Sequence, residues 1–327
     1  MEKTLNVVRK YSIFIVLLVL VAFFACLNPV FISIGNLINI TRQVSYLGIG
    51  CVGAMCCMLT GGIDLSLGSA VTMNNILIAF LMVKLGVHPV LACLAGVVMN
   101  TAIGYINGYV VSTFNMPALI VTLSTQLILE GAAYILAKGM PIFGFPEGFN
   151  FIGQGYVGPI PFCVILLIIC MLIGAFLLNK TYFGKYFFAV GSNAQASQLS
   201  GINVKQIQRL SYSLSGFFGG ICGIVLLSRT NSGQVTAGKG FEFDVISALV
   251  VGGVSVSGGT GKMSRALIGV LIMGVLNNGF VIIGVSTYMQ SVIKGFILLL
   301  AVGFDCVQRA SNPSGRQDLL LAETGLV

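Results

Sequence analysis

Polar side chains recur at helical spacing within apolar stretches of this sequence. Thr122, Gln126 and Glu130 follow one another every four residues, and Gln290 and Lys294 are also four residues apart. In an α-helix this spacing places the side chains on one face. Because an unpaired polar group is costly inside hydrocarbon, such faces are expected to line a bundle interior or a wet path. The chemistry they favour is reversible hydrogen bonding of a solute that carries donors and acceptors.

Asparagines extend this polar set. An amide both donates and accepts hydrogen bonds, which suits the hydroxyls of a sugar. An amide also joins neighbouring helices, and for any single asparagine this interpretation is the favoured one. As a group, and with Asn75 as a further member of the polar set, they make a polar translocation path plausible. The candidate path residues are Asp64, Asn74, Asn100, Asn107, Gln126, Glu130, Asn277, Asn278, Gln290 and Lys294.

Three charged positions within or between apolar stretches suggest specific roles. Asp64 follows two glycines at the junction of two apolar stretches. We expect it to cap the next helix at its positive end, with direct contact to a sugar as the alternative. Glu130 and Lys294 carry opposite charges, and a contact between them would lower the cost of burying both. We therefore hypothesise an ion pair between Glu130 and Lys294.

The sequence contains neither a phosphate-binding loop nor a zinc-binding HExxH motif. The run GGTGK at 258–262 resembles a phosphate-binding loop, but that motif needs glycine at 256 and Ser or Thr at 263. The chain has Val256 and Met263 there. His88 is the only histidine, so the HExxH zinc motif cannot form. We expect no catalytic residue, no metal and no cofactor.

The composition places these residues in a membrane. Of 327 residues, 57% are hydrophobic and 8% charged, against about 25% charged in a soluble domain. Soluble enzymes and nucleic-acid-binding domains are therefore excluded. The net charge of +8 is better explained by basic residues between spans than by a nucleic-acid partner. The nine cysteines lie in or beside apolar stretches without paired spacing, so we predict buried thiols.

Ten apolar segments predict an all-α polytopic membrane protein with a single transmembrane domain over 1–327. About ten spans are expected, with a range of eight to ten. The range reflects the eighth segment, which is too short to cross unaided and either forms a short span or is re-entrant. The segments are 11–27, 44–59, 65–85, 89–113, 117–137, 160–178, 207–227, 245–256, 265–283 and 287–307.

Ten crossings would place both termini on one side, and the basic residues indicate which side that is. Eleven would lie on the side of the termini and five on the other, which makes the first side cytoplasmic. The first group is Lys3, Arg9, Lys10, Lys180, Lys185, Lys205, Arg209, Lys262, Arg265, Arg309 and Arg316. The second group is Arg42, Lys84, Lys138, Arg229 and Lys239.

The longest internal stretch assigned to the cytoplasm lies between Leu178 and Ile207. Ser192 to Gln195 reads S-x-x-Q, which is typical of a capping box, and Gly201 is a helix-ending glycine. We predict a helix of about eight residues, roughly 12 Å long, that is too short and too polar to cross a membrane. Its small side chains would allow close approach of another protein. On physics alone a plain interfacial loop helix is the favoured interpretation.

Three blocks in order resemble one family. They are TGGIDLSLGS at 60–69, GKYFFAVGSNAQASQLSGINV at 184–204 and FDVISALVVGGVSVSGGTGKMSRALIGVLIMGVLNNG at 243–279. Together they resemble the permease subunits of ATP-binding-cassette importers for simple sugars, of the ribose, xylose and galactose type. The similarity runs from about 43 to 307. It implies a coupling segment at 184–204, whose contact residues would be Gly191, Ser192, Asn193, Ala194, Gln195, Ala196, Ser197, Gln198, Leu199, Ser200 and Gly201.

The resemblance also implies partners. An extracytoplasmic binding protein would deliver a monosaccharide, two identical or related permease subunits would form the path, and ATP-binding subunits would supply the energy. Family members often carry charges in mid-helix where this chain has Gln195 to Gln198, so shape fit is expected more than charge pairing. The chain would be a non-enzymatic, multi-pass protein of the bacterial inner membrane. Permeases for branched-chain amino acids or nucleosides, and an ion-coupled carrier with Glu130 as proton carrier, are the alternatives.

Overall fold

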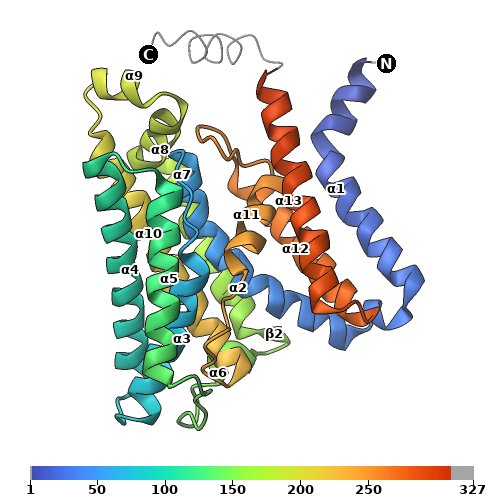
Figure 1. The fold of residues 1–327 in the computed structure, drawn as a ribbon. Coiled ribbons are helices and arrows are strands. Elements are labelled where there is room, and N and C mark those ends of the chain that lie inside the picture. Colours follow the sequence, from blue (N-terminus) through green and yellow to red (C-terminus); the bar gives the residue numbers. More distant parts are fainter. Residues whose placement is uncertain (1, 311–327) are drawn as a thin grey trace.

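The computed structural model describes residues 2–310, and their side chains from 13 to 307. About three quarters of the chain is helical (Figure 1). Two short strands pair antiparallel through Tyr156 with Pro161 and Val157 with Ile160. The elements are α1 (Glu2–Leu27), η1 (Pro29–Ile32), α2 (Ile34–Leu59), α3 (Leu67–Val83), α4 (Pro89–Phe114), α5 (Ala118–Ala137), α6 (Phe151–Gln154), β1 (Tyr156–Val157), β2 (Ile160–Pro161), α7 (Phe162–Lys180), α8 (Tyr182–Ser192), α9 (Ala194–Leu199), α10 (Val204–Thr230), α11 (Phe241–Val251), α12 (Met263–Ile282) and α13 (Thr287–Ala310).

Each predicted apolar segment lies largely within one of these helices. Seven helices of the described part are long and apolar enough to cross a bilayer, namely α2, α4, α5, α7, α10, α12 and α13. Ile13–Leu27 of α1 and the 17 residues of α3 form shorter apolar helices. The eighth segment becomes the 11-residue α11, which at 1.5 Å per residue covers about half the hydrocarbon thickness. The number of crossings therefore depends on how α1, α3 and α11 sit in the membrane.

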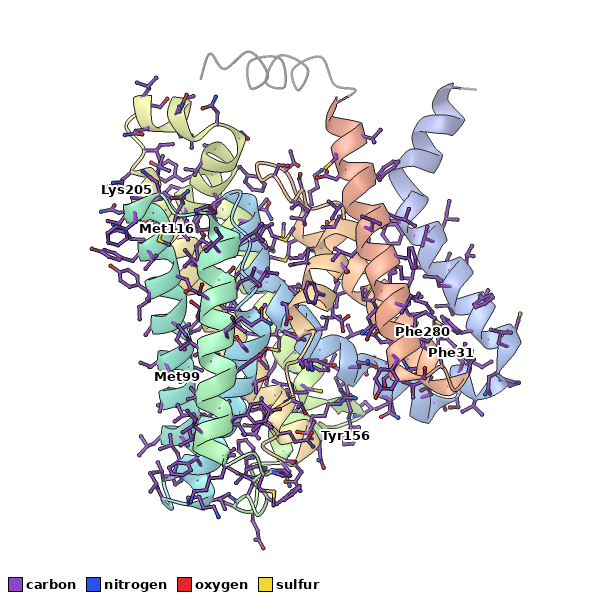
Figure 2. All side chains as sticks on the ribbon, viewed as in Figure 1. Phe31, Met99, Met116, Tyr156, Lys205 and Phe280 are labelled. Carbon is purple, nitrogen blue, oxygen red and sulfur yellow. The ribbon has the colours of Figure 1, made fainter. Side chains whose placement is uncertain are left out.

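Different helices and strands lie at the two ends of the bundle. The start of α1, the end of α13 and the short α9 lie at one end, whereas α6 and β2 lie toward the other (Figure 1). Lys205 and Met116 lie near the α9 end, and Tyr156 lies at the level of β2 (Figure 2). The side of the membrane that each end faces stays a prediction from the basic residues.

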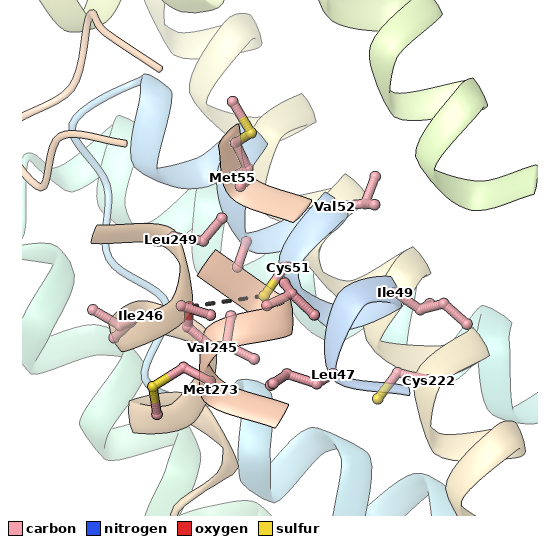
Figure 3. Close-up of a cluster of buried hydrophobic side chains, with 14 of the residues drawn as sticks. Leu47, Ile49, Cys51, Val52, Met55, Cys222, Val245, Ile246, Leu249 and Met273 are labelled. Carbon is pink, nitrogen blue, oxygen red and sulfur yellow. Dashed lines mark hydrogen bonds between the residues drawn. The ribbon is translucent and has the colours of Figure 1, made fainter. Parts of the chain in front are cut away.

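Helix α2 forms the centre of the core. Every residue from Leu47 to Leu59 is buried, as expected for a helix that is apolar all round. It packs against α7, α10, α11 and α12. Figure 3 shows part of this cluster, in which Ile49 of α2, Cys222 of α10 and Met273 of α12 have no more than 1% of their surface exposed.

The cysteines are all free, and the prediction of buried thiols holds for most of them. Cys51 donates a weak hydrogen bond to the carbonyl of Val245 at 3.8 Å (Figure 3). The prediction is wrong for Cys26 and Cys306, which lie on exposed faces of α1 and α13, while Cys93 is half-buried. The buried ones are Cys51, Cys56, Cys57, Cys163, Cys170 and Cys222.

Glycines allow α4 and α10 to approach each other closely. Gly104 and Gly108 lie four residues apart on α4, and Gly216 and Gly220 repeat that spacing on α10. A Cβ added at Gly104 or at Gly216 would collide with a backbone carbonyl oxygen of the other helix. This small-xxx-small pattern brings helix backbones together in membranes, where no hydrophobic effect drives association. Backbone contact between α4 and α10 therefore depends on the missing side chains.

Replacing either glycine by alanine should destabilise the bundle. For Gly104→Ala and Gly216→Ala we expect the free energy of unfolding to fall by about 1–3 kcal/mol, because the added methyl group overlaps backbone atoms. Gly131→Ala in α5 is the matched control, since nothing lies within 4 Å of its added Cβ and alanine is the better helix former. Thermal unfolding of the purified protein in mild detergent measures all three. Unchanged midpoints for Gly104→Ala and Gly216→Ala would contradict this packing.

Candidate functional site

Asp64 is the centre of a buried hydrogen-bond network that joins four helices. Its Oδ1 accepts the backbone N–H of Ser66 at 3.1 Å and the Ser66 hydroxyl at 2.6 Å. Its Oδ2 accepts the hydroxyl of Ser215 in α10 at 2.7 Å. Asn107 of α4 donates to Ser66 Oγ at 2.9 Å, and Thr125 of α5 donates to Asn107 Oδ1 at 2.6 Å. We call these five residues the polar network; it ties the start of α3 to α4, α5 and α10.

The structure gives Asp64 a position different from the expected cap. Helix α3 begins at Leu67, and the capping position is Ser66. Asp64 therefore bonds the capping residue and not the first-turn amides of the helix. Both of its carboxylate oxygens have donors from the protein, which offsets the cost of burying a polar group. Asp64 thus holds the α2–α3 junction against α10.

Five more asparagines make bonds between helices. Asn74 and Asn75 of α3 donate to backbone carbonyls of α10 at 2.8 and 3.2 Å. In the amide orientation that satisfies both of its polar atoms, Asn100 of α4 donates to a carbonyl of α3 at 3.2 Å and accepts an N–H of α10 at 3.3 Å. Asn278 of α12 exchanges two hydrogen bonds with Asn36 of α2, at 2.8 and 2.9 Å. These side chains hold helices together, as the favoured interpretation of each asparagine predicts.

Lys294 of α13 pairs with Asp244 of α11 and not with Glu130. Its Nζ lies 2.8 Å from Asp244 Oδ1 and donates to Oδ2 at 2.9 Å. Asn277 of α12 also donates to Asp244 Oδ2, at 3.5 Å. Glu130 instead accepts a bond from Gln126 on its own helix at 3.2 Å. The hypothesis of a Glu130–Lys294 ion pair is therefore wrong, because α11 packs against α13 and sequence spacing does not reveal which helices are neighbours.

Glu242 of α11 is a candidate that sequence reasoning missed. It is 2% exposed, and its carboxylate lies against Gly68 in the first turn of α3, where an added Cβ would collide with it. Its Oε2 has no hydrogen-bond partner within the part of the chain that the structure describes. The available signal was the acidic pair Glu242 and Asp244, since acids favour the first turn of a helix. No group of three or more His, Cys, Asp or Glu among residues 13–307 could hold a metal ion.

Apart from Gln290, the sequence candidates fall into two groups, and the acids Glu242 and Asp244 that the structure adds belong to the second. Asp64, Asn74, Asn100, Asn107 and Asn278 are buried and bonded between helices. Gln290 bonds locally, its Nε2 donating to a carbonyl just before its own helix at 2.8 Å. The other group lies on α5, α11, α12 and α13 and holds amide, carboxylate and ammonium groups, mostly half-buried. Its members are Gln126, Glu130, Glu242, Asp244, Asn277 and Lys294.

Residues 184–204 form two helices where one was expected. Ser192 is the last residue of α8, and its hydroxyl donates to a carbonyl of that helix at 2.8 Å. Asn193 caps α9, accepting the N–H of Ala196 at 2.8 Å. The predicted S-x-x-Q capping box is therefore wrong by one residue, because the asparagine side chain is an equally good cap. Helix α9 has six residues, compared with the eight expected.

The end of α9 follows the prediction. Gly201 has φ +83°, and its N–H donates to the carbonyl of Gln198 at 3.0 Å. The N–H of Ile202 reaches the carbonyl of Ser197 at 3.0 Å, which completes a Schellman motif. Apart from Ser197, the helix is exposed, and Leu199 has 91% of its surface open.

The end of α8 packs against two turns that contain glycines, one between α2 and α3 and one between α11 and α12. The N–H of Gly259, between α11 and α12, donates to the carbonyl of Leu59 at the end of α2 at 3.0 Å. An added Cβ at Gly191 would collide with that same carbonyl, and one at Gly258 would come within 2.7 Å of the amide nitrogen of Gly61. We call these five residues the glycine junction. It joins the end of α8 to the α2–α3 turn and to the α11–α12 turn.

Comparison with known proteins gives consistent matches over most of the chain. Residues 36–302 match the family model described as branched-chain amino acid transport system / permease component. The ribose import permease protein RbsC of Bacillus subtilis is 40% identical over 302 residues, covering 92% of this chain and 94% of the relative. The L-arabinose transport system permease protein AraH of Escherichia coli is 34% identical over 296 residues, covering 90% of each. No solved structure gives a significant match.

Breaking the Asp244–Lys294 pair should cost more than removing it. Lys294→Met leaves the Asp244 carboxylate without its cation, and we expect the free energy of unfolding to fall by about 1–3 kcal/mol. The double variant Asp244→Asn with Lys294→Met should recover most of that loss, and Asp244→Asn alone closes the cycle. Lys239→Met replaces an exposed lysine and is the control, with little expected change. A double-mutant cycle by thermal unfolding measures the coupling; purely additive effects would contradict the pair.

Proposed function

This chain is a member of the family of branched-chain amino acid transport system permease components, and we propose that it imports a monosaccharide as the membrane-spanning subunit of an ATP-driven transporter. The observation that carries this proposal is the 40% identity to a ribose import permease over 92% of the chain. The L-arabinose relative supports the same class of cargo. Amino acids and nucleosides are less supported, because the relatives named for a substrate here carry sugars.

We propose that the half-buried residues of the second group form part of the translocation path. Gln126 and Glu130 of α5, and Asp244 and Lys294 of α11 and α13, retain some exposure. Such groups can exchange hydrogen bonds with sugar hydroxyls without holding the sugar tightly. By contrast, the bonds of Asp64, Asn74, Asn100, Asn107 and Asn278 to other helices support a framework role for those residues. Weak sites suit a permease whose specificity resides in a separate binding protein.

We propose that α9 contacts the ATP-binding subunit. Its exposed position at one end of the bundle and the open apolar side chain of Leu199 support this role. The glycine junction would then link a displacement of α8 and α9 to the starts of α3 and α12. The further partners implied are an extracytoplasmic sugar-binding protein and a second permease subunit. With α9 on the cytoplasmic side, the larger group of basic residues would face the cytoplasm of a bacterial inner membrane.

Uptake in cells tests the proposal. Cells that express this chain with its ATP-binding subunit and binding protein should accumulate radiolabelled ribose or arabinose. Accumulation should stop when the ATP-binding subunit is omitted. Uptake that persists without that subunit and collapses with a protonophore would identify an ion-coupled carrier instead. Uptake of leucine with no uptake of either pentose would identify an amino-acid permease.

Leu199→Ser tests the contact with the ATP-binding subunit. Because Leu199 is 91% exposed, we expect no change in thermal stability but a five- to thirty-fold weaker association, as for a buried interface anchor of about 1–2 kcal/mol. Leu85→Ser is the matched control, since Leu85 is also exposed but lies between α3 and α4. Co-purification in mild detergent measures the association. Equal association of Leu199→Ser and the unaltered chain would remove Leu199 from the interface.

A further inference from the structure

A pocket of about 250 Å³ opens between α4 and α10 and has no part in the function proposed above. Tyr105 of α4 forms one wall, and the first turns of α10 form the others. The pocket is polar on the α10 side, where Gln206 and Arg209 contribute an amide and a guanidinium group. Leu210 and Ser213 complete its lining. A recess with a guanidinium group in a largely apolar lining suits an occupant that carries both an anionic and an apolar part.

Arg209 is held in this pocket by neutral groups only. Its Nε donates to Ser112 Oγ at 3.1 Å and its Nη2 donates to Thr113 Oγ1 at 3.0 Å. Its guanidinium carbon lies 4.7 Å from the ring centroid of Tyr109. Within residues 13–307 no carboxylate lies at ion-pair distance from Arg209. The side chain is therefore fixed in place while its positive charge has no counter-charge from the described chain.

An apolar stripe on α4 continues from the pocket along the helix. Leu91, Leu94, Val98, Tyr105 and Tyr109 are exposed and recur at spacings that share one helix face. The rings of Tyr105 and Tyr109 stack with centroids 6.4 Å apart. From Tyr109 to Val98 the stripe is roughly 16 Å long at 1.5 Å per residue, close to the thickness of one hydrocarbon leaflet.

The stripe and the pocket together have the layout of a lipid site. Tyrosines are enriched where hydrocarbon meets headgroups, and arginine binds phosphate through several N–H donors at once. Figure 2 shows Lys205, the residue before Gln206, near the α9 end of the bundle, and Met99 of α4 farther from that end. The cationic end of the stripe thus lies toward the end of the bundle and the apolar part toward its middle. An occupant must be anionic at one end and long and apolar beyond it.

We propose that this pocket binds the phosphate of an anionic phospholipid, whose acyl chain lies along the exposed stripe of α4. Arg209 contacts the phosphate, Gln206 hydrogen-bonds the headgroup, and Tyr105 packs at the glycerol level. On the proposed topology the site faces the cytoplasmic leaflet, which is the negatively charged one. A helix of another protein would also cover the apolar stripe, and it would need a carboxylate at the level of Arg209 to supply the anion.

The absence of tryptophan from the chain allows a direct test. Tyr105→Trp keeps an aromatic ring in the pocket and introduces a single fluorescent reporter. The full chain is reconstituted in phosphatidylcholine vesicles in which a minor fraction of the lipid has brominated chains, as either phosphatidylglycerol or phosphatidylcholine. We expect quenching to show an approximately five-fold preference for brominated phosphatidylglycerol, as for one basic residue near the surface.

A second substitution locates the effect. Gln206→Glu, made in the Tyr105→Trp background, adds a negative charge to the pocket without removing the bonds of Arg209, and should lower the preference to near one. Gln208→Glu is the control, because it changes the same helix by the same charge outside the pocket lining and should keep the preference. Both variants are first matched for thermal stability.

Each other outcome overturns the proposal. Equal quenching by the two brominated lipids would show that no anionic lipid is selected. Equal loss of preference in Gln206→Glu and Gln208→Glu would show a general charge effect. Loss of the preference when inorganic phosphate is added would show that the pocket binds a soluble anion. Negligible quenching by either lipid would show that another protein surface covers the stripe.

Discussion

The polar network centred on Asp64 holds four helices of this bundle together. A carboxylate that is buried within a membrane bundle is stable only when hydrogen-bond donors compensate its charge. Ser66 and Ser215 supply them, at 2.6 and 2.7 Å. Satisfying Asp64 fixes the junction between α2 and α3 against α10, and Asn107 with Thr125 extends that constraint to α4 and α5.

This network lies beside the close contact between the backbones of α4 and α10. The glycines at 104 and 216 leave room for the carbonyls of the facing helix. With the helices this close, the short side chain of Asn100 in α4 reaches the N–H of Gly220 in α10. The hydrogen bonds between helices therefore depend on the close packing, because longer side chains at the contact would separate the donors from their acceptors.

The sequence predicted the helices better than the contacts between side chains of different helices. The apolar segments and the helix-ending role of Gly201 could be predicted because they depend on neighbours within a few residues. The partner of Lys294 could not, because Asp244 and Glu130 are equivalent until the packing of α11 against α13 is known. Glu242 was missed for the same reason, since its burial depends on Gly68 in a distant helix. The cap of α9 was misplaced because Ser192 and Asn193 are both good capping residues.

The glycine junction shows how a short exposed segment can be tied to the interior. At Gly191, Gly258 and Gly259 the neighbouring atoms lie where a side chain would otherwise stand, and the Gly259 N–H bonds the carbonyl of Leu59 directly. A contact between backbones has no side-chain rotamers to absorb a small displacement. A shift of α8 toward this junction would therefore press on the Leu59 carbonyl and on the amide of Gly259. Five residues beyond Leu59 stands Asp64, so the turn that receives the shift also carries the polar network of the bundle.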